Sequence, residues 1–231
     1  MKKVSKTTEI TPIAYIHNDF KEKFGVPRQS GRVETISEIV FEPQFRDENA
    51  LLGMEQFSHL WLIFDFSLSH RDKWSPTIRP PRLGGNKRVG VFASRSPFRP
   101  NNLGLSVVKI EQIKKTADRG TVLIVSCADL IDNTPIYDIK PYIPYADSIP
   151  DALGGYAEEN KGHTLEVIFP EELKAKIPER KIKILTECLA DDPRPSYQDD
   201  GRGYTMLFNK FDISFSVSGG ILTVTDVKEV Q

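Results

Sequence analysis

Through its first 150 residues the chain alternates between short apolar runs and stretches rich in glycine, asparagine and proline. The run His59–Phe66 (HLWLIFDF) is aromatic and too short for an independent helix, and Val33–Phe41 alternates apolar with polar residues for much of its length. Alternation over roughly four to eight residues is typical of half-buried β-strands. The 16 prolines among 231 residues also disfavour a helical bundle, because proline breaks helix interiors. The pattern predicts an antiparallel barrel or sandwich, not a βαβ sheet.

The strand His59–Phe66 has one purely apolar face, made by Leu60, Leu62, Phe64 and Phe66, and we expect this face to lie in the core. Further strands are expected at Val89–Ala93, Leu105–Ile113, Thr121–Cys127 and Ile136–Ile143. Arg95 and Arg99 would then follow the end of a core strand, where a guanidinium group is well placed to hold a ligand.

The character of the chain changes after the acidic segment Ser148–Lys161. The following pattern predicts a strand, two helices, a turn segment and a closing hairpin: His163–Phe169, Pro170–Lys176, Pro178–Leu189, Asp191–Tyr204, and Phe208–Val217 with Ile221–Val227 across Ser-Gly-Gly. We therefore predict a mainly β protein, with an N-terminal antiparallel β-barrel over residues 1–161 and a small α+β C-terminal domain over residues 162–231.

Several classes of protein are disfavoured by what the sequence lacks. The longest apolar run, Leu60–Phe64, is far shorter than the roughly 20 residues that span a bilayer, and the first residues have no apolar signal segment. Cys127 and Cys188 have no partner at ligand spacing, so we expect a reducing cytosolic setting, no disulfide framework and no metal. Glycine fingerprints for dinucleotides and nucleoside triphosphates are missing.

One segment, Arg79–Arg99, concentrates positive charge without a single acidic residue. The chain as a whole is nearly neutral, with 31 Lys+Arg against 32 Asp+Glu, so the rest of it is acidic overall. Uncompensated cations interleaved with Phe92 and Phe98 suit a surface that meets phosphate groups, because each neutralised phosphate releases counterions. The alternative is a solvated basic loop.

A second segment, Asp129–Tyr142, holds three carboxylates and two tyrosines around the turn Asp132–Pro135. The amides of such a turn, with Thr134, can bind an adenine, a ribose or an amino-acid moiety, and an aspartate favours a sulfonium or ammonium group by charge. The alternative is that Asp132 and Asn133 only form an Asx turn, the commoner use of these residues in loops.

Five segments in this order resemble the TsaA-like, or TrmO, family of tRNA (adenine-N6)-methyltransferases: KEKFGVPRQSG, FSHLWLIFDF, RPPRLGGNKRVGVFASRSPFRPNNLGLS, DLIDNTPIYDIKPYIPYADS and DPRPSY. The resemblance covers almost the whole chain. It implies a cytoplasmic homodimer that uses S-adenosylmethionine to methylate N6 of threonylcarbamoyladenosine beside the tRNA anticodon. It also implies a barrel methyltransferase without a Rossmann fold, which accounts for the missing glycine fingerprint.

The resemblance also places the cofactor contacts, on the matching loops of this chain. They are Gln29, Ser30, Gly31, Ser67, Leu68, Arg95, Leu105, Asp132, Thr134, Pro135, Ile136 and Tyr137. The sequence reads RPNNLG where the family pattern has RPNPxG, so Asn102 replaces a proline and relaxes that loop.

For the reaction, we expect Asp138 or Asp132 to accept a proton and Tyr142 to contact the base. The residues expected to bind anticodon-loop phosphates are Arg79, Arg82, Lys87, Arg88 and Arg99. Two other functions remain open from the sequence: a noncatalytic RNA-binding β-barrel, and a methyltransferase with an acceptor other than tRNA.

Overall fold

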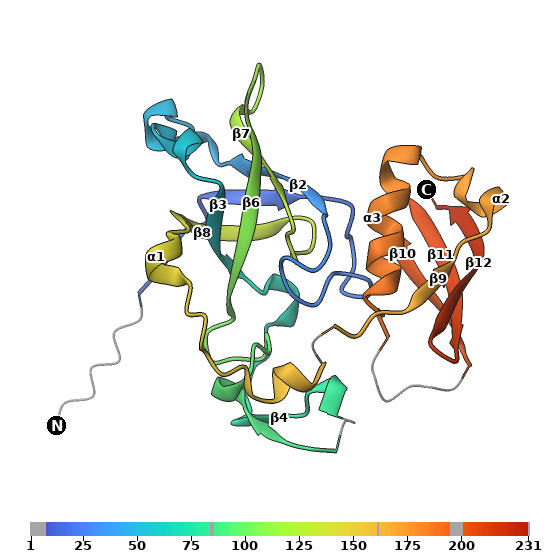
Figure 1. Cartoon of the computed structure of the whole chain (residues 1–231). Helices are drawn as coiled ribbons and strands as arrows, with labels where there is room; N and C mark the ends of the chain where they lie inside the picture. Colours follow the sequence, from blue (N-terminus) through green and yellow to red (C-terminus); the bar gives the residue numbers. More distant parts are fainter. Residues whose placement is uncertain (1–7, 84–85, 161, 195–200, 231) are drawn as a thin grey trace.

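The computed structural model describes residues 8–83, 86–160, 162–194 and 201–230. Its first part is a closed barrel in the strand order β1-β2-β7-β6-β3-β8, in which neighbouring strands run antiparallel (Figure 1). The strands are β1 (Ala14–His17), β2 (Ile36–Phe41), β3 (His59–Asp65), β6 (Leu103–Thr116), β7 (Gly120–Ser126) and β8 (Thr134–Pro141). The predicted antiparallel barrel is confirmed.

The barrel is filled by the apolar face expected for β3. Leu60 and Leu62 are fully buried and Phe64 is 3% exposed, whereas Phe66 lies past the end of the strand and is half-buried. Phe64 pairs across the ladder with Gly104 of β6, and its ring occupies the space that a side chain at position 104 would need. A glycine is therefore required where this aromatic ring crosses the neighbouring strand.

The prediction of a core strand at Val89–Ala93 is wrong, because only Val89 and Gly90 form a strand. Strand β5 (Val89–Gly90) pairs only with β4 (Thr77–Ile78) in a two-stranded sheet outside the barrel, and Val91–Ala93 forms a 3₁₀ turn. The carbonyl oxygen of Val91 accepts hydrogen bonds from the Ser94 hydroxyl (2.8 Å) and the Arg99 guanidinium (3.1 Å). The Val91 N–H donates to the carbonyl oxygen of Pro76 (2.9 Å), so the polar groups of this residue are satisfied outside the barrel ladder.

The segments between the barrel strands, and the stretch between β8 and β9, contain only short helices among the described residues. Besides the turn at Val91–Ala93, these are the α-helix α1 (Pro144–Asp147) and 3₁₀ turns at Pro43–Phe45, Glu48–Leu51, Met54–Gln56, Ser67–Ser69, Pro81–Leu83 and Gly155–Asn160. No helix among the described residues is long and apolar enough to cross a membrane.

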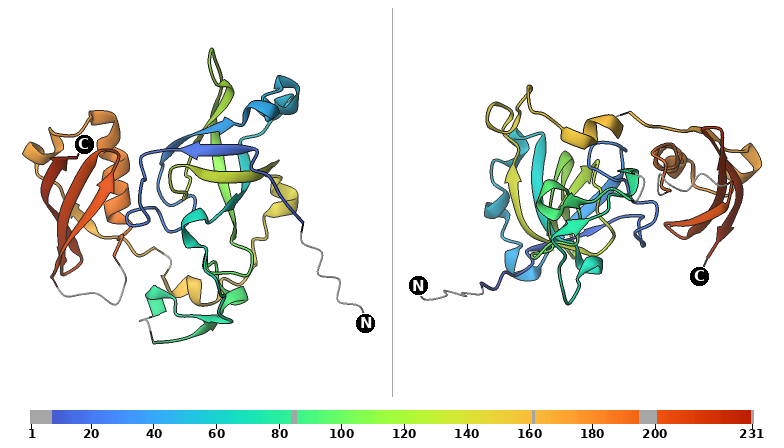
Figure 2. Two further views of the ribbon diagram at one scale, coloured as in Figure 1. Left: turned by 180° about the vertical axis from the view of Figure 1, so that it is seen from behind. Right: turned by 90° about the horizontal axis from the view of Figure 1, so that it is seen from below.

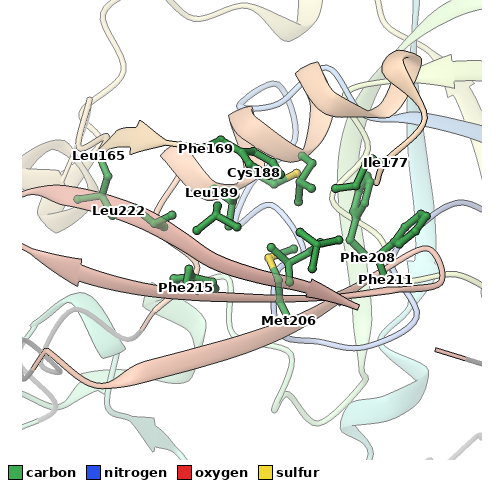
Figure 3. Packing of buried hydrophobic residues seen from close by; sticks show 14 of the residues in the cluster. Leu165, Phe169, Ile177, Cys188, Leu189, Met206, Phe208, Phe211, Phe215 and Leu222 are labelled. Atoms are coloured by element: carbon green, nitrogen blue, oxygen red, sulfur yellow. The ribbon is translucent and has the colours of Figure 1, made fainter. Parts of the chain in front are cut away.

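The last part of the chain forms a four-stranded sheet in the order β10-β11-β12-β9, which curves around helix α3 (Figure 2). Its elements are β9 (Glu166–Ile168), α2 (Glu171–Lys174), α3 (Glu179–Ala190), β10 (Gly203–Phe208), β11 (Phe211–Ser218) and β12 (Ile221–Glu229). The predicted α+β character is confirmed. The separate strand β10 was not predicted, because only a two-stranded hairpin was expected there. Figure 3 shows the core between α3 and the sheet, where Leu189, Phe208 and Phe215 are fully buried.

The connection between β1 and β2 packs into the core of the C-terminal part. Phe20 and Val33 lie in this connection, yet both are buried within the hydrophobic cluster of the C-terminal part. The ring of Phe20 meets that of Phe208 edge-on, with centroids 5.6 Å apart. Asp19 accepts hydrogen bonds from Lys181 of α3 and from Asn209 (2.6 Å each to Oδ1). In Figure 1 this connection, in dark blue, runs beside α3.

Candidate active site

A cleft of about 1580 Å³ opens at the end of the barrel where β3 ends and β6 and β8 begin. Its walls come from the β1–β2 connection, the segments between β3 and β6, the start of β8, and the residues around Tyr156 and Pro193. The cleft therefore gathers loops that lie far apart in the sequence around one open end of the barrel.

Five of the expected cofactor residues line this cleft: Gln29, Ser67, Leu68, Arg95 and Thr134. Ser30 and Gly31 instead line a smaller cavity of about 210 Å³, together with His59, Val107, Lys109 and Cys127. The remaining expected residues are not among the described residues that line either space, namely Leu105, Asp132, Pro135, Ile136 and Tyr137. Ile136 is fully buried in the barrel core, and Leu105 is 55% exposed.

Arg95 and Asp129 line the cleft together with Gln29. The Arg95 guanidinium donates a hydrogen bond to the amide oxygen Oε1 of Gln29 (2.6 Å). Burial raises the pKa of the Asp129 carboxyl, although hydrogen bonds from Ser106 and the Ser30 backbone and the charge of Arg95 act against this rise. Sequence reasoning counted Asp129 among the acids of its segment but gave it no role, because burial depends on the tertiary fold.

The loop of Gln29–Gly31 is fastened at both ends. The Arg32 guanidinium pairs with the Asp191 carboxylate, and Arg28 donates to the carbonyl oxygen of Asp192 (2.5 Å). Burial raises the pKa of the Asp192 carboxyl, but hydrogen bonds from Arg194 (2.9 Å) and His163 (3.1 Å) outweigh burial and hold this pKa below its usual range. Residues of the C-terminal part thus hold the predicted cofactor loop by an ion pair and a hydrogen bond.

The backbone of Gly31 binds this loop to the barrel, at the residue that follows β7. Its N–H donates to the carbonyl oxygen of Cys127 (3.1 Å), and Gly31 has a φ of +80°, a conformation that favours glycine. The loop is therefore held between the barrel and the C-terminal part.

The three residues expected to act in the reaction are not among the described residues that line the cleft. The Asp132 carboxylate accepts hydrogen bonds from the Asn18 backbone (2.9 Å) and from Lys21 (2.7 Å), so it binds the β1–β2 connection and not its own turn. Asp138 pairs with Lys140 (2.9 Å), and Tyr142 packs against Trp61 with ring centroids 5.8 Å apart. Their expected roles stay predictions.

The basic segment contributes a wall to the cleft through Arg79, Arg88 and Arg99. Lys87 is exposed outside the lining, and the side chain of Arg82 lies outside the described part of the structure. In the family motif DPRPSY, Pro195, Ser196 and Tyr197 also lie outside the described residues.

Aromatic side chains accompany these cations. Trp74 and Phe92 are 49% and 70% exposed, and their ring centroids lie 6.1 Å apart. Arg71 lies over the ring of Phe98 at 3.5 Å, and Arg99 lies 5.7 Å from the Phe92 centroid. The sequence analysis gave Arg71 and Trp74 no role in binding. The available signal was that a cation and an aromatic residue lie a few positions before the basic segment Arg79–Arg99.

No cluster of histidine, cysteine and acidic side chains suited to a metal ion is found in the part of the chain that the structure describes. The fold and the cleft together define a β-barrel protein with a cation-lined cleft, joined to a small α+β domain.

Two family models match this chain, one in its first part and one in its last part. The model of the tRNA-methyltransferase O N-terminal domain matches residues 15–148, and that of the TrmO C-terminal domain matches residues 162–230. The chain belongs to the TrmO family.

Individual relatives agree with this membership. The tRNA (adenine(37)-N6)-methyltransferase of Escherichia coli K12 is 40% identical over 216 residues, which cover 89% of this chain and 92% of that protein. A putative S-adenosylmethionine-dependent methyltransferase RcsF of Pseudomonas aeruginosa is 40% identical over 223 residues, covering 90% and 91%. The crystal structure of TrmO from P. aeruginosa superposes with a TM-score of 0.81 at 32% identity, covering 99% of this chain and 100% of that one.

Proposed function

We propose that this chain is a methyltransferase that transfers a methyl group from S-adenosylmethionine to N6 of adenosine 37 in tRNA, where the adenosine carries a threonylcarbamoyl group. Family membership gives the activity its first support. The observation that carries it in the structure is a single cleft that joins Gln29, Arg95 and Asp129 to a wall of arginines and aromatic rings. Gln29, Arg95 and Asp129 suit a small charged cofactor, and the arginines and aromatic rings suit RNA.

Bound S-adenosylmethionine supplies an electrophilic methyl group on its sulfonium centre. The chain's own task is then to align N6 with that methyl group, and alignment alone is worth roughly 7–11 kcal/mol in favourable cases. N6 in this substrate is urea-like and a poor nucleophile, so removal of its proton would help further. Asp138 and Asp132 remain the proposed acceptors and Tyr142 the proposed contact to the base.

The RNA side of the proposal rests on charge and on stacking surfaces. Arg79, Arg88 and Arg99 meet phosphates of the anticodon loop in this assignment, and exposed Trp74 and Phe92 offer faces for unstacked bases. A single-stranded loop is the part of tRNA in which a protein can reach one base edge.

Assembly as a cytoplasmic homodimer is also part of the proposal. Leu52, Tyr145 and Leu153 are 86%, 91% and 98% exposed, and such apolar side chains are suited to contact with a second copy. Light scattering on the purified protein would give twice the 26.1 kDa mass of the chain.

The decisive test is methyl transfer with defined tRNA. Purified protein and S-adenosylmethionine should convert tRNA that carries threonylcarbamoyladenosine, and mass spectrometry of its nucleosides should show one added methyl group. In cells that lack the protein this methylated nucleoside should disappear, and its persistence where no other enzyme makes it would refute the proposal.

Two measurements separate the other functions. A noncatalytic RNA-binding barrel needs no small-molecule site, so calorimetry would detect no binding of S-adenosylmethionine. If the acceptor were not tRNA, the double variant Arg82→Glu and Arg88→Glu would leave activity intact. With tRNA as acceptor, the same variant loses activity, and the salt dependence of tRNA binding falls by about one unit of slope for each phosphate that the variant no longer neutralises.

A further inference from the structure

Arg71 differs from most other arginines of the cleft in what its guanidinium group contacts. The guanidinium groups of Arg88 and Arg95, for example, donate hydrogen bonds to neighbouring side chains at 3.0 and 2.6 Å. Arg71 lines the same cleft, and it makes no hydrogen bond or ion pair with any residue that the structure describes. Its N–H groups are therefore available to a ligand.

An aromatic ring supports this guanidinium group. The Arg71 guanidinium lies over the ring of Phe98, 3.5 Å from the ring centroid, and Phe98 is half-buried. A guanidinium group on an aromatic face gains a cation–π interaction and keeps the donors along its edge for another partner. Arg79 also makes no hydrogen bond within the described chain, but no ring contact supports it there. Arg71 thus combines available donors with a supported position.

Asn102 joins the two loops that carry this pair. Its side-chain amide donates hydrogen bonds to the carbonyl oxygens of Pro97 (2.7 Å) and Ser69 (3.4 Å). Pro97 directly precedes Phe98, and Ser69 lies two residues before Arg71. The proline of the family pattern at position 102 has no side-chain donor to make these bonds. The asparagine of this chain therefore helps to hold Arg71 beside Phe98.

We propose that Arg71 binds the carboxylate of the threonyl group on adenosine 37 and so contributes to recognition of the modified nucleoside. This assignment rests on the proposed function. A guanidinium group matches a carboxylate in shape and charge, and the two can form a pair of parallel hydrogen bonds. The threonyl group is attached to N6, the atom that receives the methyl group, so its carboxylate lies only a few bonds from the reacting centre.

The place of Arg71 in the chain suits this ligand. Ser67 and Leu68, which are expected to contact the cofactor, precede it, and Trp74, an exposed face for a base, follows it. All four residues line the one cleft. A substituent on N6 lies where the cofactor meets the RNA, and Arg71 belongs to the segment that runs between the residues assigned to each. A phosphate of the RNA is the other oxyanion that this guanidinium could bind, and the test separates the two.

The test uses two tRNAs that differ only in the charge of the threonyl group. One carries threonylcarbamoyladenosine at position 37, and the other carries its methyl ester, which removes the negative charge. Wild-type protein should bind the acid about tenfold or more tightly than the ester, the effect expected for a charge-assisted hydrogen bond. Fluorescence anisotropy in the presence of S-adenosylhomocysteine measures both affinities without methyl transfer.

Variants of the pair should reduce this preference. Arg71→Gln should bring the two affinities to within about twofold of each other, because the amide carries no charge. Arg71→Lys should keep part of the preference, since an ammonium group retains the charge but not the planar fork of donors. Phe98→Leu should also lower the preference while Arg71 is still present.

Lys73→Gln is the matched control. It removes a positive charge from another exposed residue of the same segment and the same cleft. Its preference for the acid over the ester should equal that of wild type. Circular dichroism would verify that each variant is folded.

The outcomes distinguish this assignment from the proposed function. A preference in Arg71→Gln equal to that of wild type, or a wild type that binds both tRNAs equally, would overturn the assignment. An equal loss of affinity for both tRNAs in Arg71→Gln would overturn it too, because a phosphate would then be the partner of Arg71. A wild-type protein that transfers no methyl group to the acid tRNA would instead refute the proposed function.

Discussion

Gly104 shows how one residue sets the shape of the barrel wall. It pairs with Phe64 across β3 and β6, and the Phe64 ring fills the space above it. Gly104→Ala should destabilise the protein by about 1–3 kcal/mol, because the added methyl group forces a buried ring to move. Thermal denaturation would detect the loss as a lower Tm.

Gly203→Ala is the matched control, since no atom lies within 4 Å of a Cβ built there. Its Tm should stay near that of wild type. A Gly104→Ala protein as stable as this control would show that the Phe64 ring shifts freely.

Asp129 is expected to lower stability at neutral pH. Burial raises its pKa in the folded protein, while Ser106, the Ser30 backbone and Arg95 oppose the rise, so the folded state holds the ionised carboxylate less readily than the unfolded chain does. Asp129→Asn should therefore increase the free energy of unfolding at pH 8. The gain should shrink as pH falls through the raised pKa and vanish below about pH 3.9, the ordinary aspartate pKa.

Urea unfolding at pH 8 and at low pH would measure this difference, with the exposed Asp118→Asn variant as reference. If Asp129→Asn is less stable than wild type at pH 8, the hydrogen bonds of the carboxylate outweigh the effect of its burial.

Among the elements, the β1–β2 connection depends most on distant partners. The Arg32 guanidinium pairs with Oδ1 of Asp191. The backbone nitrogen of Arg28 lies 3.5 Å from Oδ2 of the same carboxylate. Asp191→Asn removes the charge that holds both residues. On the proposed function, calorimetry should show weaker binding of S-adenosylmethionine, because Gln29 lies between these two anchors.

Glu229→Gln provides the control for this variant. Glu229 lies in the C-terminal part, as Asp191 does, and forms an exposed ion pair with Lys210. Exposed ion pairs contribute little to stability. Equal cofactor affinity in the two variants would show that the loop keeps its conformation without the Asp191 charge.

Elements differ in how much of them could be predicted from the sequence. The apolar face of β3 was predictable, because alternation of side chains directly reflects burial on one face. The turn at Val91–Ala93 was not, since the Val91 carbonyl oxygen there accepts hydrogen bonds from the side chains of Ser94 and Arg99, which only the fold brings to it. The short strand β1 has too few residues to form a pattern.

The candidate site was predicted in part. Gln29, Ser67, Leu68, Arg95 and Thr134 were named from the family motifs and do line the cleft. Asp129 could not be singled out, because its unpartnered oxygen results from burial by elements that are distant in sequence.

At the scale of the whole molecule, Phe20 joins the two parts, because it follows β1 of the barrel in the chain and is buried in the core of the C-terminal part. We expect them to unfold in one transition. Both tryptophans, Trp61 and Trp74, lie in the N-terminal part, so their fluorescence reports on that part alone, whereas circular dichroism at 222 nm follows α3. The two signals should coincide in wild type.

Phe20→Ala should separate these signals. Truncating a buried phenylalanine destabilises a core by about 3–5 kcal/mol, and here the loss falls on the C-terminal cluster. The dichroism transition should then move to lower urea concentration than the fluorescence transition. If both signals shift together, Phe20 contributes equally to the stability of both parts.

The placement of Phe20 also has a consequence for synthesis of the chain. Asp19 and Asn209, which are hydrogen-bonded in the folded protein, are 190 residues apart. At about 5–20 residues per second, the first of them waits roughly 10–40 s on the ribosome for the second to be made. The loop of Gln29 therefore emerges early and gains its anchors, Asp191 and Asp192, more than 150 residues later, so on the proposed function cofactor binding is completed only after those residues are made.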